Sequence, residues 1–534
     1  MSKSEIGIAL SATTKSAHSW EMATIAFPLL ALVGWSFSLS SIHVSQMNDL
    51  GIISVMPPLT IASLILLQIS FAIQLRQEVL SWPKLLLHLL LLIFMLYSIT
   101  TLIESEPRFS VVYRHAGYTE YIMRTGGVDP MLDAYFNWPG FFILAAFVTK
   151  ITGLTSILAY AAWSPVFLNL IYLGPLYMIF RSCTSDQRHI WLALWIFFLT
   201  NWIGQDYFSP QGINFFFYLV IVAILLTWFR APAKSATSPD QAVPEPEPAS
   251  RRSMFNRPAR IVRDVFAWLA VPDENVQAIP KAQSVILLGC LIICFAFVVF
   301  SHPLTPFFTI ASVSALAYFR RITPRWLPIL MMVMTFGWIF FMTRAYLAGH
   351  LDSLTGGIGQ LSGTITANVT DRVIQGDAEH DFIAAMRVGM TLLVWLLAAA
   401  GAWLRLRRGH RDATLILLAT VPFALIVAQS YGGEMLLRIY LFTLPAMVFF
   451  VAAPYVSLGT HPVRRSAAIS LLCLALLGGF FFTRYGNERN DYITQAEVMG
   501  VAQLYRIAQP HSLLIQGWEG TPWKYQEFES FDYL

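Results

Sequence analysis

Long apolar segments repeat along most of this 534-residue chain, and they constrain its fold more than any other feature. Each holds about 20 mostly apolar residues, which is the length that an α-helix needs to cross a hydrocarbon layer of roughly 30 Å. Hydrophobic residues make up 56% of the chain and charged residues 12%, a balance well outside that of a soluble domain. The sequence therefore predicts an all-α integral membrane protein.

Thirteen of these segments are predicted to be transmembrane helices. They cover residues 25–44, 51–74, 83–103, 156–180, 189–203, 210–229, 282–301, 304–319, 325–347, 387–405, 412–430, 436–456 and 466–484. A further apolar segment, Pro139–Gly153, is too short for a span and has a length more typical of re-entrant or interfacial segments. It is therefore left out of the count.

Basic residues gather in alternate loops, and this bias orients the chain. One set of loops carries Arg76, Lys84, Arg181, Arg188, Arg320, Arg321, Arg325, Arg405, Arg407, Arg408, Arg411, Arg464 and Arg465. The opposite short loops, 45–50, 204–209, 302–303 and 431–435, contain no Lys or Arg. Since Lys and Arg favour cytoplasmic loops, we expect a multi-pass protein of the cytoplasmic membrane, with its N-terminus in the cytoplasm and its C-terminus outside.

The chain divides into two predicted bundles. Its predicted parts are a cytoplasmic N-terminus (1–24), a first bundle (25–229) with an outer loop at 104–155, a cytoplasmic linker (230–281), a second bundle (282–484) with an outer loop at 348–386, and an outer tail (485–534). Within the linker, Arg257–Val271 has the apolar spacing of an interfacial amphipathic helix. The tail predicts a helix near 498–507 and a strand near Leu513–Trp518, and is expected to pack on the outer loops.

Three polar clusters fall on the predicted outer face, and the first is Tyr113–Gly140. Its candidate catalytic residues are Glu120, Asp133 and His115. Aromatic residues, Trp138 among them, are interleaved with these charges. Sugar rings stack on aromatic faces and need fixed hydrogen-bond acceptors, so the mixture suits a carbohydrate. The same aromatics also fit the belt of a membrane interface. If Arg114–Met123 is helical, Glu120 could lie close to His115.

The second cluster, Gln205–Gly212, contains the candidates Asp206, Tyr207 and Gln211. Ser209–Pro210 has the pattern of an N-cap followed by the first helical turn. The next helix would then direct its positive N-terminal end to the outer face, a position suited to phosphate. The alternative is a tight turn with Asp206 as a polar filler.

The third cluster, Ser430–Arg438, places Glu434 and Arg438 four residues apart at the membrane surface. Such spacing favours an ion pair along one helix. Arg438 could instead hold a phosphate through the planar fork of its guanidinium. Arg344 and Arg387, near the outer ends of other spans, are two further candidates, although arginines there can also extend towards the head groups.

The motifs RHAGYTEYI, DAYFNWPGFF, QDYFSPQG and GGEMLLR follow in this order on a many-span chain. In this the chain resembles bacterial membrane glycosyltransferases of the GT-C superfamily. The resemblance implies a sugar donor linked to polyprenyl phosphate, a base from an acidic residue of the first large outer loop, and basic residues for the carrier phosphate. The chain departs from the common pattern by two extra spans before that loop and by the lack there of an Asp-Asp or Asp-x-Glu pair.

The sequence thus predicts an inverting hexosyl- or pentosyltransferase that acts on a glycan, lipid or protein acceptor at the outer face. The base would be Glu120, Asp133 or Asp206, with His115 nearby. The residues expected to bind the donor are Arg438, Arg344, Arg387, Tyr207, Gln211, Glu434 and Trp138. No cofactor and no nucleic acid are expected, and a divalent metal is left open. Two alternatives are a polysaccharide polymerase or ligase, and a transporter, although few charges lie in mid-span as a transporter would require.

Overall fold

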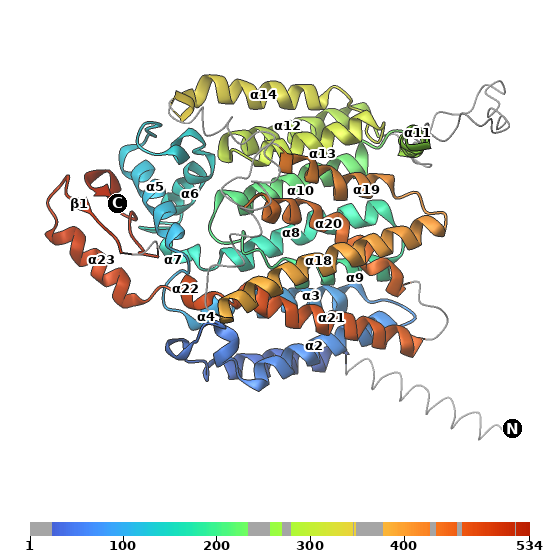
Figure 1. The fold of residues 1–534 in the computed structure, drawn as a ribbon, viewed down its shortest axis with the longest axis horizontal. Helices are drawn as coiled ribbons and strands as arrows, with labels where there is room; N and C mark the ends of the chain where they lie inside the picture. Colours follow the sequence, from blue (N-terminus) through green and yellow to red (C-terminus); the bar gives the residue numbers. More distant parts are fainter. Residues whose placement is uncertain are drawn as a thin grey trace.

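The computed structural model describes residues 24–232, 257–269, 279–344, 346–348, 378–427, 434–456, 462–517 and 520–534. Long helices lie side by side in one bundle, and shorter elements gather at its left-hand end in Figure 1. The long apolar helices are Thr24–Leu39, α2 (Pro58–Arg76), α3 (Trp82–Tyr97), α8 (Ser164–Cys183), α9 (Gln187–Thr200), α10 (Pro210–Trp228), α12 (Lys281–Ser301), α13 (Thr305–Tyr318), α14 (Leu327–Met342), α18 (Ala378–Arg407), α19 (Ala413–Thr420) with η6 (Val421–Val427), α20 (Met435–Val456) and α21 (Pro462–Tyr485).

Every predicted transmembrane segment overlaps one of these helices, so the prediction of an all-α membrane protein is confirmed. Among the described residues, 7 helices are long and apolar enough to cross a membrane. The others are shorter, and the count of thirteen stays a prediction. Segment Pro139–Gly153 forms α6 (Gly140–Ile151), whose 12 residues extend about 18 Å at the usual helical rise. This length is too short for a span, which agrees with leaving the segment uncounted.

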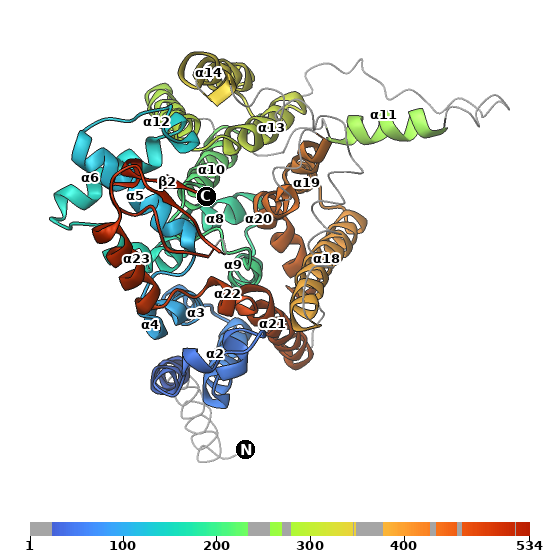
Figure 2. The ribbon, with the colours of Figure 1, turned by 60° about the vertical axis from the view of Figure 1, so that its left-hand side comes forward.

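Helix α20 forms the centre of the bundle. It packs against α9, α18 and α19, and Figure 2 shows it enclosed by its neighbours. The helix is apolar on all sides, which is the pattern of a helix buried on all faces. It begins at Met435, and this start places Arg438 one turn inside the bundle.

The cap at the left-hand end in Figure 1 consists of short elements from two distant parts of the chain. From the first outer loop come α4 (Ile99–Ile103), α5 (Ser110–Thr125), η3 (Ala134–Asn137), α6 and α7 (Leu158–Ala161). From the tail come α22 (Glu488–Asp491), α23 (Gln495–Ile507), β1 (Leu513–Leu514), η7 (Phe528–Ser530) and β2 (Asp532–Tyr533). Strands β1 and β2 pair in parallel, with Leu513 opposite Asp532.

The tail lies directly on α5, as expected. A Cβ atom added at Gly117 would lie 1.8 Å from the carbonyl oxygen of Lys524, so this close approach requires a glycine. Beside it, Phe528 packs edge-on against Tyr118, with ring centroids 5.4 Å apart. At the base of the cap, Arg108 is within 2.5 Å of Glu488 and 3.2 Å of Asp491, which ties the first loop to α22.

The predicted amphipathic helix forms α11 (Arg257–Leu269) at the opposite end of the bundle from the cap (Figure 1). Val265 and Phe266 are exposed, and Phe266 also contacts Phe319. Residues 233–256 of the linker lie outside the described residues, as does 349–377 of the second predicted outer loop. Helix α18 begins at Ala378, earlier than the predicted span at 387.

The orientation of the chain can be tested by labelling cysteines from outside the cell. In a chain whose four cysteines are replaced, we expect Met131→Cys, exposed in the cap, to react with an impermeant maleimide in intact cells. His410→Cys, exposed in the basic loop after α18, should react only after the membrane is permeabilised. The reverse pattern would place the cap in the cytoplasm.

Candidate functional site

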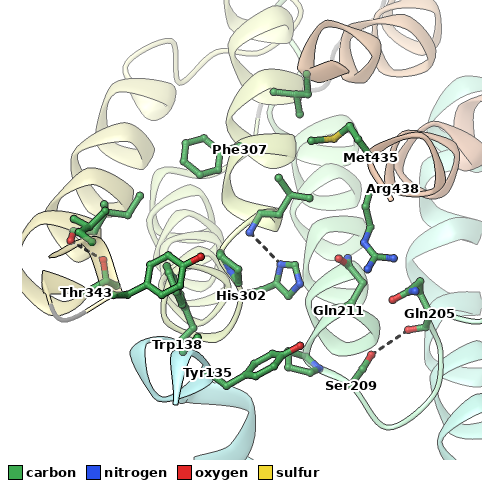
Figure 3. Close-up of a pocket in the computed structure, with 18 of the residues that line it drawn as sticks. Tyr135, Trp138, Gln205, Ser209, Gln211, His302, Phe307, Thr343, Met435 and Arg438 are labelled. Atoms are coloured by element: carbon green, nitrogen blue, oxygen red, sulfur yellow. Dashed lines mark hydrogen bonds between the residues drawn. The ribbon is translucent and has the colours of Figure 1, made fainter. Parts of the chain in front are cut away.

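A cavity of about 600 Å³ lies where the cap meets the bundle. Figure 3 shows side chains from both halves of the chain pointing into it. Its walls are formed by η3, by the loop before α10, by the α12–α13 loop, by α14 and by the start of α20. The lining residues are Ala134, Tyr135, Trp138, Gln205, Tyr207, Ser209, Pro210, Gln211, His302, Pro303, Leu304, Phe307, Ile339, Thr343, Tyr346, Leu347, Leu425, Met435 and Arg438.

Three long helices begin at this cavity. Pro210 and Gln211 of α10, Leu304 at the start of α13, and Met435 of α20 all line it. The N-terminus of α10 is formed as predicted, because Ser209 Oγ accepts a hydrogen bond of 3.3 Å from the amide of Gly212. Helix N-termini carry partial positive charge and favour anions, so three of them around one space suit a negatively charged group.

Arg438 supplies a full positive charge to the same space. Its side chain is only 6% exposed, and its guanidinium lies beside Gln211 in Figure 3. It donates a hydrogen bond of 2.6 Å to Glu434, whose side chain is 37% exposed. The predicted ion pair is therefore formed, and Arg438 also lines the cavity, whereas its binding of a phosphate stays a prediction.

His302 is a lining residue that the sequence analysis did not single out. It lies in the loop between α12 and α13, and its side chain is 5% exposed. Its Nδ1 atom accepts hydrogen bonds from the amides of Leu304 (3.2 Å) and Thr305 (3.1 Å). Burial lowers the pKa of His302 to about 3, and the charge of Arg438 contributes. In the sequence, His302 could have been identified as a candidate because it is a histidine at the end of an apolar span, directly before a proline.

The rest of the wall is apolar and includes Trp138, a predicted binding residue. Trp138 meets Tyr346 edge-on, with ring centroids 5.3 Å apart. Phe307, Ile339 and Leu347 continue the wall. The ring centroids of Phe307 and Phe336 lie 6.3 Å apart, and Phe336, a residue of α14, is 44% exposed. Apolar side chains therefore lie both in the cavity and on the exposed side of α14.

Asp206 lies outside the cavity but fixes one of its walls. Its carboxylate is 4% exposed, and accepts hydrogen bonds from Arg484 (2.9 Å) and Asn169 (2.6 Å). The residues on either side of it, Gln205 and Tyr207, line the cavity. The loop closes tightly on α10, since a Cβ at Gly212 would lie 3.1 Å from the carbonyl oxygen of Gln205. Asp206 thus holds the loop that carries Tyr207, a predicted binding residue.

Glu120 and His115 lie on different faces of α5. Glu120 faces the tail, where it binds Arg124 at 2.7 Å and accepts a hydrogen bond of 3.3 Å from the amide of Glu527. His115 is fully buried, and its Nδ1 donates a hydrogen bond of 2.7 Å to the carbonyl of Phe208. Burial lowers the pKa of His115 to about 4, so the ring is neutral among its aromatic neighbours. Neither residue lines the cavity, and the two are not brought together.

Asp133 is not a lining residue of the cavity, but it directly precedes one. It caps η3 by accepting a hydrogen bond of 2.9 Å from the amide of Tyr135, and its side chain is partly exposed. The next two residues, Ala134 and Tyr135, line the cavity. The charges that act on Tyr135 include both Asp133 and Arg438. None of the three predicted candidates for the base lines the cavity, and Asp133 is the one that both precedes a lining residue and has a partly exposed carboxylate.

Arg344 and Arg387, the other two arginines predicted to bind the donor, do not line the cavity. Arg344 is exposed and donates to the carbonyl of Phe340 at 3.2 Å. Arg387 donates to the carbonyl of Thr483 at 2.9 Å. Within the described ranges, no three histidine, cysteine, aspartate or glutamate side chains gather in a way that could hold a metal ion.

Two solved structures are similar to this chain in fold. One is the oligosaccharyltransferase of Archaeoglobus fulgidus, crystallised with a tethered acceptor peptide, with a TM-score of 0.45, 11% identity, and coverage of 88% of this chain and 63% of that chain. The other is ArnT from Cupriavidus metallidurans bound to undecaprenyl phosphate, with a TM-score of 0.45, 11% identity, and coverage of 84% and 85%.

The chain spans less than two thirds of the length of the archaeal oligosaccharyltransferase. No protein-family model matches the chain, and no curated protein does. At 11% identity the likeness concerns the fold alone, so the roles of individual residues have to come from the cavity.

Proposed function

We propose that this protein transfers a sugar from a polyprenyl-phosphate carrier to a glycan, lipid or protein acceptor on the outer face of the cytoplasmic membrane. One observation carries the proposal: a single cavity is lined by the buried Arg438, by the starts of three helices and by apolar side chains. A donor of this kind has the matching parts, which are an anionic phosphate and a long hydrocarbon chain.

The donor fits this cavity in one direction. Its phosphate binds beside Arg438 and Gln211, where positive charge is concentrated and water is largely excluded. Its hydrocarbon chain follows Phe307 and Ile339 towards Phe336 and leaves the protein at α14. The sugar then lies on the cap side, between Trp138 and Tyr135, whose ring faces suit the CH faces of a sugar.

The reaction requires a base and a stabilised leaving group. Asp133 takes the proton of the acceptor hydroxyl as its oxygen attacks the anomeric carbon from the side opposite the phosphate. The new bond to the acceptor oxygen forms while the bond from the anomeric carbon to the phosphate oxygen breaks. The polyprenyl phosphate leaves with that electron pair, and Arg438 stabilises the charge that develops on it. Attack from the opposite side inverts the anomeric configuration.

Binding of the carrier tests this proposal directly. We expect the full-length protein in lipid nanodiscs to bind undecaprenyl phosphate and to discriminate against undecaprenol, which lacks the phosphate. Arg438→Ala should weaken binding about 10- to 100-fold, because a hydrogen-bonded charge contributes about 1.5–3 kcal/mol. Arg438→Lys should recover only part of the loss, since lysine keeps the charge without the planar fork.

Two control variants separate phosphate binding from a structural role. Arg344→Ala removes an exposed arginine outside the cavity and should leave binding unchanged. Glu434→Gln removes the ion-pair partner and keeps Arg438. If Glu434→Gln reproduces the loss seen in Arg438→Ala, the arginine acts as a structural partner. Equal binding of the phosphate and the alcohol by the unmodified protein would contradict the proposed function.

A further inference from the structure

His302 makes a contact that fixes where its ring carries a proton. Its Nδ1 atom lies 3.2 Å from the amide nitrogen of Leu304 and 3.1 Å from that of Thr305, both at the start of α13. Backbone amides are always donors, so Nδ1 has to be the acceptor. In a neutral imidazole the proton then resides on Nε2. The ring is neutral because burial lowers its pKa to about 3.

The Nε2–H group lies on the cavity side of the ring. His302 lines the cavity, and Figure 3 shows its ring on the same side as Gln211 and Arg438. Within the part of the chain that the structure describes, no hydrogen bond to Nε2 is present, whereas Nδ1 has its partners. Nε2 is not fully enclosed by protein, so a molecule in the cavity can reach it. The side chain is therefore arranged to meet a hydrogen-bond acceptor that enters the cavity.

The acceptor that fits best is an oxygen of an anion. The ring accepts hydrogen bonds from two amides at the start of α13 that have no partner within the helix. Hydrogen bonds in a chain polarise one another, so the positive end of the helix makes Nε2–H a stronger donor. Arg438 is close enough to act on the charge state of the ring. A neutral donor beside a guanidinium adds a hydrogen bond to the same anion without the repulsion that a second cation would bring.

We propose that His302 binds the phosphate of the lipid-linked donor, with Nε2–H donating a hydrogen bond to a phosphate oxygen beside Arg438. This inference rests on the proposed function and adds to it a binding residue contributed by the second bundle. The ring has two separate roles, because Nδ1 caps α13 while Nε2 meets the ligand. It is a donor and not a base, since its one free nitrogen carries a proton.

Two amide replacements separate these roles. In His302→Asn the side-chain oxygen occupies the position of Nδ1, which preserves the acceptor for the amides of α13 and removes the donor to the ligand. In His302→Gln the amide nitrogen occupies the position of Nε2, which preserves the donor to the ligand and removes the acceptor for the amides of α13. With undecaprenyl phosphate as the probe in nanodiscs, we expect His302→Asn to lose about tenfold in affinity at an unchanged melting temperature. His302→Gln should bind within about threefold of the unmodified protein and should melt at a lower temperature, because the amides at the start of α13 lose their acceptor.

The possible results distinguish the two proposals. Undiminished binding by His302→Asn, alongside a loss in Arg438→Ala, would overturn the role of His302 and leave the proposed function standing. A loss in His302→Gln as large as that in His302→Asn would also overturn it, because the ring would then matter only for structure. If the unmodified protein does not prefer undecaprenyl phosphate to undecaprenol, both proposals fail.

Discussion

Asp133→Asn is expected to lower the rate of sugar transfer by about 10²–10⁴-fold, the usual effect of losing a general base. Asparagine keeps the oxygen that accepts the hydrogen bond from the amide of Tyr135, so η3 should stay capped. Binding of the carrier should remain close to normal, because the change removes basicity and no phosphate contact. The measurement is transfer from radiolabelled polyprenyl-phosphate sugars in membranes, together with carrier binding by the purified variant.

Glu120→Gln is the matched control. Glu120 faces the tail and pairs with Arg124, and a surface pair of this kind contributes about 0–1 kcal/mol, so transfer should stay within about threefold of normal. A reversed result, with Glu120→Gln inactive and Asp133→Asn active, would place the base on the face of α5 towards the tail. Normal transfer by both variants would leave the base outside this loop.

The second large effect is on stability, at the buried pair of Asp206 and Arg484. Arg484→Met is expected to destabilise the protein by about 3–5 kcal/mol, because it leaves the carboxylate of Asp206 buried without its counter-charge. Asn169 would remain as a hydrogen-bond donor, which does not replace a charge. Thermal unfolding in detergent should show the loss as a markedly lower melting temperature.

A double variant identifies the cause of this loss. Asp206→Asn combined with Arg484→Met removes both charges and should recover much of the stability, whereas two unrelated defects would add. Arg489→Met is the surface control, since Arg489 and Asp49 form an exposed pair 2.9 Å apart that should contribute little. If the double variant is as unstable as the sum of the two single ones, charge burial is not the reason.

Features that depend on neighbouring residues could be predicted from the sequence. The apolar segments gave helices at the expected places because their length and composition are local properties. The cap at Ser209 and the pair of Glu434 with Arg438 were also predictable, since both follow from fixed spacing along one helix. The tail was expected on the outer loops, and Lys524 indeed lies against Gly117.

Features that depend on distant residues could not be predicted. Asp206 finds its counter-charge in Arg484, 278 positions later, and no spacing rule connects them. His302 became a candidate only when the loop between α12 and α13 was seen beside Arg438. The expected meeting of His115 and Glu120 failed for a local reason. Five positions along a helix turn the side chain by about 140° from its starting direction, which separates the two faces of α5.

The contact of the tail with α5 has a consequence for how the protein is made. The first outer loop emerges early in synthesis, but its packing is completed by Phe528 and the carbonyl of Lys524, which follow every long apolar helix in the sequence. Both bundles are therefore synthesised before the residues that complete the cap. The loop can reach its final packing only after those residues have been made.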